Sequence, residues 1–207
     1  MIGNILSQIP GEVRLYLVAG TLGHAAFSAE IAGPDDFRSY RYLLYRPVVP
    51  DSADDAQAPA RTPGAVLAFV MLNPSTATAD KDDPTIAKCR RFARHWGFEH
   101  LLIANAYAWR STDPKAMLRA AKRGEDIVGE YNDRVIEAVA AYAGVVVCAW
   151  GANITHDRCA RVHGLIPEAK RHAIRITAKS RQPEHPLYLP EALRPGLWTH
   201  GVGWSTP

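Results

Sequence analysis

The feature that most constrains this fold is a series of short apolar runs separated by segments with helical periodicity. The runs cover residues 66–72, 101–106 and 145–149, and a fourth strand with weaker alternation is expected at 173–177. Strands that are apolar along their whole length are typical of a parallel sheet covered by helices on both faces. The sequence therefore predicts an α/β fold, a three-layer α/β/α sandwich around a four-stranded parallel sheet.

Segments between these runs carry helix signals. Asp83 precedes Pro84, which pairs an N-cap with a proline at the first helical position, and Gly97 is expected to end that helix. Asn132 is predicted to cap a second helix, and residues 155–164 are predicted to form a third. A further strand is expected at 40–45.

The length suits one domain of 207 residues. We expect an α/β core at 65–190, an N-terminal elaboration at 1–64 and a C-terminal tail at 191–207. Residues 50–64 are rich in Asp, Ala and Pro, which predicts a mobile loop.

The composition, 47% apolar and 22% charged, is ordinary for a soluble globular protein. No apolar run approaches the roughly 18 residues of a membrane span, and the first residues lack the pattern of a secretion signal. The three cysteines are odd in number and lack paired spacing, which argues against a disulfide framework and a Cys-based zinc site. We therefore expect a cytoplasmic protein without a membrane partner. Its net charge of +3 permits a nucleic-acid partner without requiring one.

Polar and aromatic residues follow each predicted strand. Because the carboxyl ends of parallel strands share one rim of a sheet, these residues are expected to converge. Amides can pair with the edge of a nucleobase, aromatic rings can stack on it, and cations can meet phosphate. The residues concerned are Asn73, Pro74 and Ser75, then Asn105, Tyr107, Trp109 and Arg110, then Trp150, Gly151 and Asn153, and finally Lys179, Ser180, Arg181, His185 and Pro186.

Each of these residues also has a purely structural interpretation. Asn73 before a proline can serve a turn, and Trp150 can belong to the core. A buried amide such as Asn105 needs a structural partner or a ligand. The charges of the first helix, among them Lys88 and Arg91, usually form a solvated face, and a phosphate-binding face is the less common alternative.

Several motifs, taken together and in order, resemble an uncharacterised bacterial and phage family known as domain of unknown function 1643. The similarity spans about residues 40–189, with a departure at Ser180-Arg181-Gln182, where a glycine is expected. The motifs are Met71-Leu72-Asn73-Pro74-Ser75-Thr76, Asp82-Asp83-Pro84-Thr85-Ile86, Trp96-Gly97-Phe98, Asn105-Ala106-Tyr107-Ala108, Asn132-Asp133, Ala149-Trp150-Gly151 and His185-Pro186-Leu187-Tyr188-Leu189.

The same motifs are more distantly similar to the uracil-DNA glycosylase superfamily. That resemblance implies a uracil-DNA-glycosylase-like fold in which Asn73 positions the attacking water and Asn105 reads the edge of the base. It also implies that His185 binds the base and that Leu187 enters the DNA stack. Two departures stand out. Met71 and Leu72 replace a small residue, and Leu187-Tyr188 replaces the expected Ser-Pro.

The sequence and the resemblance together favour an enzyme that acts on a nucleobase, nucleotide or DNA at the N-glycosidic bond, without a metal or cofactor. The predicted catalytic residues are Asn73 and His185. The predicted substrate-binding residues are Pro74, Ser75, Asn105, Tyr107, Trp109, Trp150 and Gly151, and the predicted nucleic-acid-binding residues are Lys88, Arg91 and Arg181.

Two alternatives remain open at this point. One is a nucleic-acid or nucleotide binding module without catalysis, which depends on the basic residues. The other is a metal-dependent nucleotide hydrolase or transferase that uses Asp80 or Asp82, although two nearby carboxylates are a weak metal signal.

Overall fold

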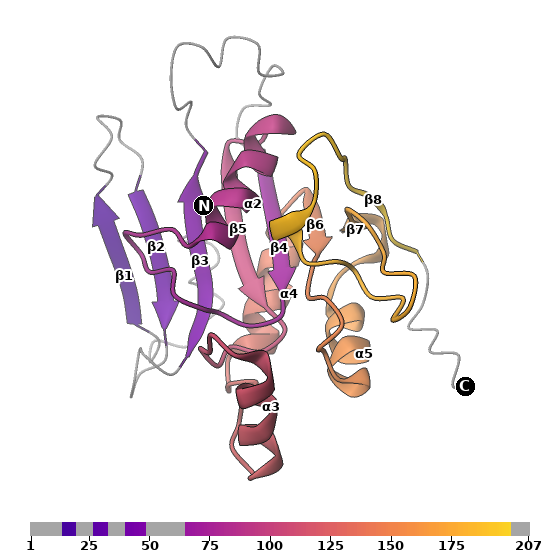
Figure 1. Cartoon of the computed structure of the whole chain (residues 1–207). Coiled ribbons are helices and arrows are strands. Elements are labelled where there is room, and N and C mark those ends of the chain that lie inside the picture. Colours follow the sequence, from indigo (N-terminus) through magenta and orange to yellow (C-terminus); the bar gives the residue numbers. More distant parts are fainter. Residues whose placement is uncertain (1–13, 20–26, 33–39, 49–64, 200–207) are drawn as a thin grey trace.

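The computed structural model describes residues 14–19, 27–32, 40–48 and 65–199 (Figure 1). The described residues form an eight-stranded sheet in the order β1-β2-β3-β5-β4-β6-β7-β8. The strands are β1 (Arg14–Ala19), β2 (Phe27–Ala32), β3 (Arg41–Pro47), β4 (Val66–Met71), β5 (His100–Asn105), β6 (Val145–Cys148), β7 (Arg171–Ala173) and β8 (Gly196–Leu197). The helices are α2 (Pro84–His95), α3 (Pro114–Lys122), α4 (Asn132–Tyr142) and α5 (His156–Leu165). The predicted loop at 50–64 lies outside the described residues.

The sheet is mixed. β4 pairs in parallel with β5 and β6, and β6 pairs in parallel with β7. β1, β2 and β3 extend the sheet beyond β5 through antiparallel pairs, and β8 adds an antiparallel strand beside β7. The predicted α/β class is confirmed, but the prediction of a four-stranded sheet is wrong, because the N-terminal elaboration and the C-terminal tail both contribute strands. The fourth predicted strand lies earlier and is shorter, at Arg171–Ala173.

Helices cover both faces of the sheet. Phe69 and Ile103 pack on the face covered by α2, whereas Val70 and Leu102 pack with α4 and α5 on the other face. This division follows from the strand order. The step from β4 to β5 runs one way along the sheet and the step from β5 to β6 runs back, so right-handed connections place α2 and α4 on opposite faces.

That reversal creates a switch point between the carboxyl ends of β4 and β6. The chain leaves β4 toward β5 on one side and returns past β4 to β6 on the other (Figure 1). Loops that diverge from neighbouring strands leave a crevice between them, which is where ligands bind in open α/β sheets. The fold therefore brings the loop after Met71 and the loop after Cys148 to one crevice.

The predicted start of α2 is confirmed. Asp83 is its N-cap and accepts the Ile86 N–H at 2.9 Å, and Pro84 is its first residue. At the other end Gly97 follows the C-cap with a φ of 83°, a conformation that favours glycine. None of the helices in the described ranges has the length and apolar character that crossing a bilayer requires.

The prediction for Asn132 is wrong. Tyr131 is the N-cap of α4, and Asn132 lies inside the helix, fully buried. Its Nδ2 donates to the carbonyls of Asn105 and Ala106, both at 3.0 Å. The next residue, Asp133, accepts from Arg158 at 2.6 Å and from Arg161 at 2.7 Å. The Asn132-Asp133 motif therefore fastens α4 to the end of β5 and to α5.

Candidate functional site

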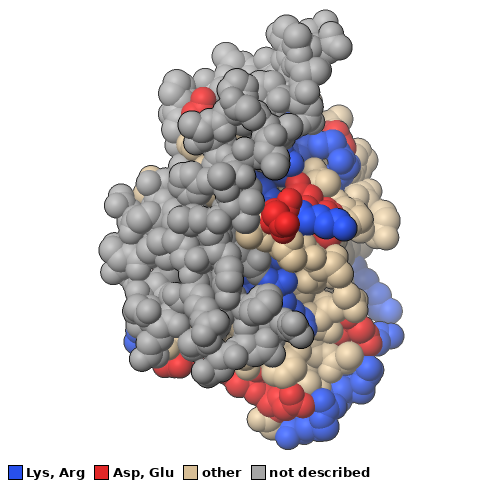
Figure 2. Space-filling model, turned by 90° about the vertical axis from the view of Figure 1, so that its left-hand side faces the viewer, with Lys and Arg blue, Asp and Glu red and all other residues tan. Residues whose placement is uncertain are grey.

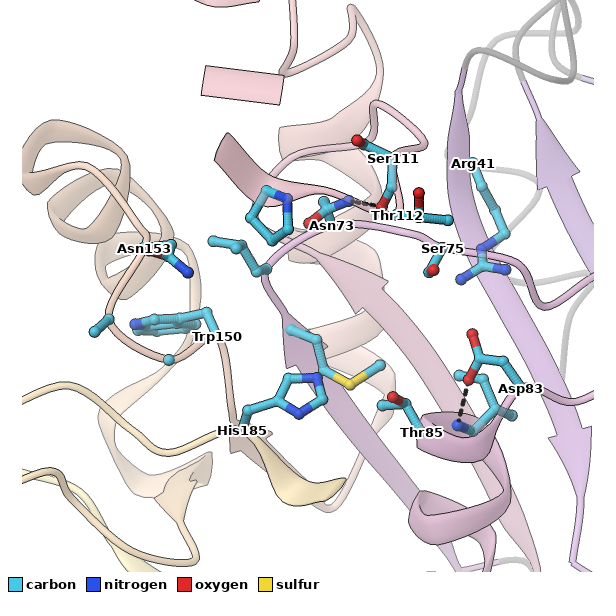
Figure 3. Close-up of a pocket in the computed structure, with 16 residues that line it drawn as sticks. Arg41, Asn73, Ser75, Asp83, Thr85, Ser111, Thr112, Trp150, Asn153 and His185 are labelled. Atoms are coloured by element: carbon cyan, nitrogen blue, oxygen red, sulfur yellow. Dashed lines mark hydrogen bonds between the residues drawn. The ribbon is translucent and has the colours of Figure 1, made fainter. Parts of the chain in front are cut away.

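A pocket of about 380 Å³ lies at the switch point (Figure 3). Its walls come from the start of β3, the end of β4 and the loop after it, the start of α2, the segment around the start of α3, the loop after β6 and the segment before residue 186. The structure brings together five of the predicted site residues here: Asn73, Ser75, Trp150, Gly151 and His185.

Asn73 is held in one orientation by its amide NH₂ group. Nδ2 donates to the Pro74 carbonyl at 2.9 Å and to the Ser111 carbonyl at 2.8 Å. No described residue donates to Oδ1, so this atom remains as an acceptor in the pocket wall. Pro74 does not line the pocket. Its carbonyl accepts from Asn73 and also from the Ser111 N–H at 2.9 Å, which ties the two loops together.

His185 lies across the pocket from Ser111 and Thr112 (Figure 3). Its Nδ1 accepts the Leu187 N–H at 3.4 Å. Burial lowers the pKa of the imidazole, and the attraction of Asp83 opposes this only in part, so the ring is neutral at neutral pH. Because Nδ1 is an acceptor, the proton of the neutral ring is on Nε2. His185 is therefore a neutral N–H donor.

Gly151 lies beside this histidine. Its φ is +72°, and a Cβ built there would meet the His185 Cβ at 3.9 Å. The distance is an ordinary van der Waals contact, but a side chain at this backbone conformation would be strained. The turn after β6 therefore requires glycine.

Trp150 is both a core residue and a pocket wall. It is 1% exposed, its Nε1 donates to Gln182 Oε1 at 2.7 Å, and its ring meets Trp198 edge-on at 5.6 Å between centroids. These contacts fix the ring, so Trp150 holds the loop after β6 in place at the pocket wall. The two interpretations of this tryptophan are thus compatible.

The structure does not bring the aromatic residues after β5 into the pocket. The Tyr107 hydroxyl pairs with Thr155 Oγ1 at 2.9 Å and accepts the Thr155 N–H at 3.1 Å, at the start of α5. Trp109 packs edge-on against Tyr40 at 5.6 Å. Both belong to the apolar cluster on the face covered by α4 and α5.

Asn105 is fully buried and does not line the pocket either. Neither atom of its side-chain amide has a hydrogen-bond partner among the described residues. Its register partner on β4 is Met71, which does line the pocket. Asn105 is thus one strand away from the pocket wall, with an unsatisfied amide.

The predicted nucleic-acid-binding residues lie outside the pocket. Lys88 and Arg91 both pair with Glu191, at 3.0 Å and 2.7 Å, and Arg181 is an exposed residue with a φ of 55°. In the described part of the face that Figure 2 shows, basic side chains lie among acidic ones. The cations of α2 are therefore partly balanced by a neighbouring carboxylate.

Sequence reasoning missed several pocket residues. The most consequential are Arg41, at the start of β3, and Asp83, for which the sequence indicates only a helix cap. The sequence did contain a signal for Arg41, because it is a charged residue inside the apolar stretch 40–45. The others include Thr85, Ser111 and Thr112, whereas Asn153 was already expected at this rim because it follows the third predicted strand.

Asp82, a carboxylate that the metal-dependent alternative would use, already accepts hydrogen bonds at both of its oxygens. Its Oδ1 accepts from Arg46 at 2.7 Å and its Oδ2 accepts from Arg90 at 2.9 Å. Arg46 also donates to the carbonyls of Thr78 and Ala79, so this ion pair organises the loop that leads to α2.

Comparison with known proteins gives one match. The sequence pattern of a family described as "Protein of unknown function (DUF1643)" matches residues 41–187. No match was found among curated proteins or among solved structures. The matched span includes every described residue that lines the pocket.

Proposed function

This chain belongs to the DUF1643 family, and we propose that its pocket hydrolyses the N-glycosidic bond of a nucleobase in a nucleotide or in DNA. The observation that carries the proposal is the orientation of Asn73. Both of its amide hydrogen bonds are donated to carbonyls, which leaves Oδ1 as an acceptor for a water molecule in the pocket.

In this mechanism Asn73 Oδ1 positions a water for attack on C1′ of the sugar. An amide is a weak base, so its contribution is placement of the water near the reacting carbon. The C1′–N bond breaks and its electron pair leaves with the base. The water oxygen bonds to C1′ and its proton passes to solvent.

His185 supports the departure of the base. As a neutral donor it can give an Nε2–H hydrogen bond to the negative charge that develops on the base. A donor held in place before the reaction stabilises such charge more than water does. The leaving base is then protonated from solvent.

The size and walls of the pocket suit this substrate. A volume of about 380 Å³ lies in the range of sites for small organic ligands. The fixed Trp150 forms part of the wall. Ser75, Thr85 and Asn153 bring polar groups to the same pocket.

We extend the proposal to the fold family, a uracil-DNA-glycosylase-like arrangement. The parallel pairing of β4 with β5 and β6 supports it, as do the residues at the strand ends. Asn73 follows β4 and Trp150 follows β6, in the order that the resemblance implies.

The alternatives receive less support. A binding module that relies on α2 needs free cations, whereas Lys88 and Arg91 are paired with Glu191. A hydrolase that uses Asp82 needs an available carboxylate, whereas both oxygens of Asp82 accept from arginines.

The test compares wild type with Asn73→Ala on uracil-, hypoxanthine- and hydroxymethyluracil-containing oligonucleotides, single-stranded and duplex, with base release as the readout. We expect release from at least one substrate by wild type and a loss of about 100-fold or more in the variant. Glu137→Ala, at an exposed residue that does not line the pocket, provides the control and should retain the activity. Absence of release from every substrate by wild type would overturn the proposal.

A further inference from the structure

One wall of the pocket carries a buried arginine that the proposed hydrolysis does not use. Arg41 is 1% exposed, and its Nη1 donates to the Ala77 carbonyl at 2.5 Å. Its Nε has no hydrogen-bond partner among the described residues. Burial lowers the pKa of the guanidinium to about 10, so the group stays charged at neutral pH. A buried cation with an unsatisfied donor is costly unless a ligand completes it.

Asp83 lies next to Arg41 on the same wall (Figure 3). Its Oδ1 accepts the Ile86 N–H at 2.9 Å and its Oδ2 accepts the Ala77 N–H at 3.3 Å. Ionised carboxylate oxygens have about four acceptor positions between them, so these two bonds leave acceptor capacity toward the pocket. Arg41 and Asp83 therefore present a donor and an acceptor side by side.

The charge balance of the pocket selects the kind of ligand. Among the described residues that line it, the ionisable side chains are Arg41, Asp83 and His185. The first two carry opposite charges and His185 is neutral at neutral pH. A phosphate placed against Arg41 would also lie near the carboxylate of Asp83, so this wall favours a neutral ligand over an anion.

We propose that Arg41 and Asp83 together read the lactam edge of a nucleobase, a ring carbonyl next to a ring N–H. This inference rests on the proposed function and names the substrate class of the same pocket. The guanidinium donates to the ring carbonyl and the carboxylate accepts the ring N–H, as two parallel charge-assisted hydrogen bonds. Uracil and hypoxanthine carry such an edge, and uracil methylated at both ring nitrogens does not.

The test is binding of free uracil, 1,3-dimethyluracil and inorganic phosphate at millimolar concentrations, measured by calorimetry with the full chain. We expect uracil to bind at least about tenfold more tightly than 1,3-dimethyluracil, because the methyl groups remove the ring N–H and with it one charge-assisted hydrogen bond. Asp83→Asn should weaken uracil binding by a similar factor. Asparagine is also a good N-cap, so the variant should keep its fold, which circular dichroism checks.

Asp113→Asn is the matched control. Asp113 is the N-cap of α3, accepts the Lys115 N–H at 2.8 Å and does not line the pocket. This variant makes the same chemical change at another helix start and should bind uracil as wild type does.

Each outcome decides between the two proposals. Equal binding of uracil and 1,3-dimethyluracil, tighter binding of phosphate, or no binding of uracil would overturn the proposal that Arg41 and Asp83 bind a lactam edge. Base release that persists unchanged in Asp83→Asn would overturn it while the hydrolase proposal stands. Selective uracil binding without base release from any oligonucleotide would support recognition of the lactam edge and overturn the proposed hydrolysis.

Discussion

At the scale of single residues, the least expected feature is Asn105. A buried amide without partners costs about 1–3 kcal/mol, and proteins retain such groups when function requires them. The residue beside it across the strand pair, Met71, has a flexible side chain that adapts readily to a new neighbour. Asn105 therefore lies behind the pocket wall without lining the pocket, and this position does not support the base-reading role that the resemblance implies.

Replacement of Asn105 by leucine tests this cost. Because the change removes an unsatisfied amide and keeps a similar volume, we expect the free energy of unfolding to stay equal or to rise by about 1 kcal/mol. Urea denaturation measures this change, and base release by the same variant should fall if the amide reads the base. A loss of stability above about 2 kcal/mol would mean that the amide has a structural partner.

A second prediction concerns His185 and the dependence of the free energy of unfolding on pH. Its folded-state pKa lies below the ordinary value of 6.5, so the unfolded chain binds the proton more readily. The stability from this group is present above pH 6.5 and is lost as the pH falls toward the folded pKa. His100 and His163 are shifted in the same direction. Denaturation of His185→Asn across this range should show a weaker loss on acidification than wild type, and an identical pH profile would contradict the assignment.

At the scale of elements, the attachment of α4 is the contact that differs most from the sequence prediction. Asn132 donates to two carbonyls at the end of β5, and this contact replaces the predicted cap. The buried carbonyl of Ala106 also accepts from Arg158 Nε at 2.5 Å, so the junction of α4, α5 and β5 is a small network. Such networks fix the relative position of the elements they join.

Asn132→Ala should lower the free energy of unfolding by about 2–3 kcal/mol, because buried carbonyls lose a donor. Thermal or urea denaturation measures the loss. Glu137→Ala, on the exposed side of the same helix, is the control and should change stability by less than about 0.5 kcal/mol. Similar losses in both variants would contradict the role of the buried contact, because alanine favours the helix at both positions.

At the scale of the whole molecule, the sequence predicted the strands that are buried on both faces. The runs at β4, β5 and β6 are apolar because helices cover both sides of them. β1, β2 and β8 are peripheral strands whose pattern is too weak to stand out. α3 was missed although Asp113-Pro114 repeats the start signal of α2.

The same reasoning explains which site residues were predictable. Asn73, Trp150 and His185 come after strands or in loops at one rim, and the rule for parallel strands places them there. Arg41 was missed because β3 runs antiparallel to β5, so its first residue lies at the rim where β5 ends. A rule that considers only the residues after a strand cannot find a residue at the start of one.

The contribution of β3 also sets the smallest unit that can carry the complete pocket. A fragment restricted to residues 65–190 would contain β4, β5, β6 and β7 but would lack the guanidinium on one wall. The matched family span starts at residue 41, at that arginine. During folding the wall forms only when β3 pairs with β5 across a long separation in the chain, a contact that is costly to close. Assembly of the pocket is therefore coupled to completion of the sheet, and a chain with β3 unpaired would present the crevice between β4 and β6 without the guanidinium of Arg41 on its wall.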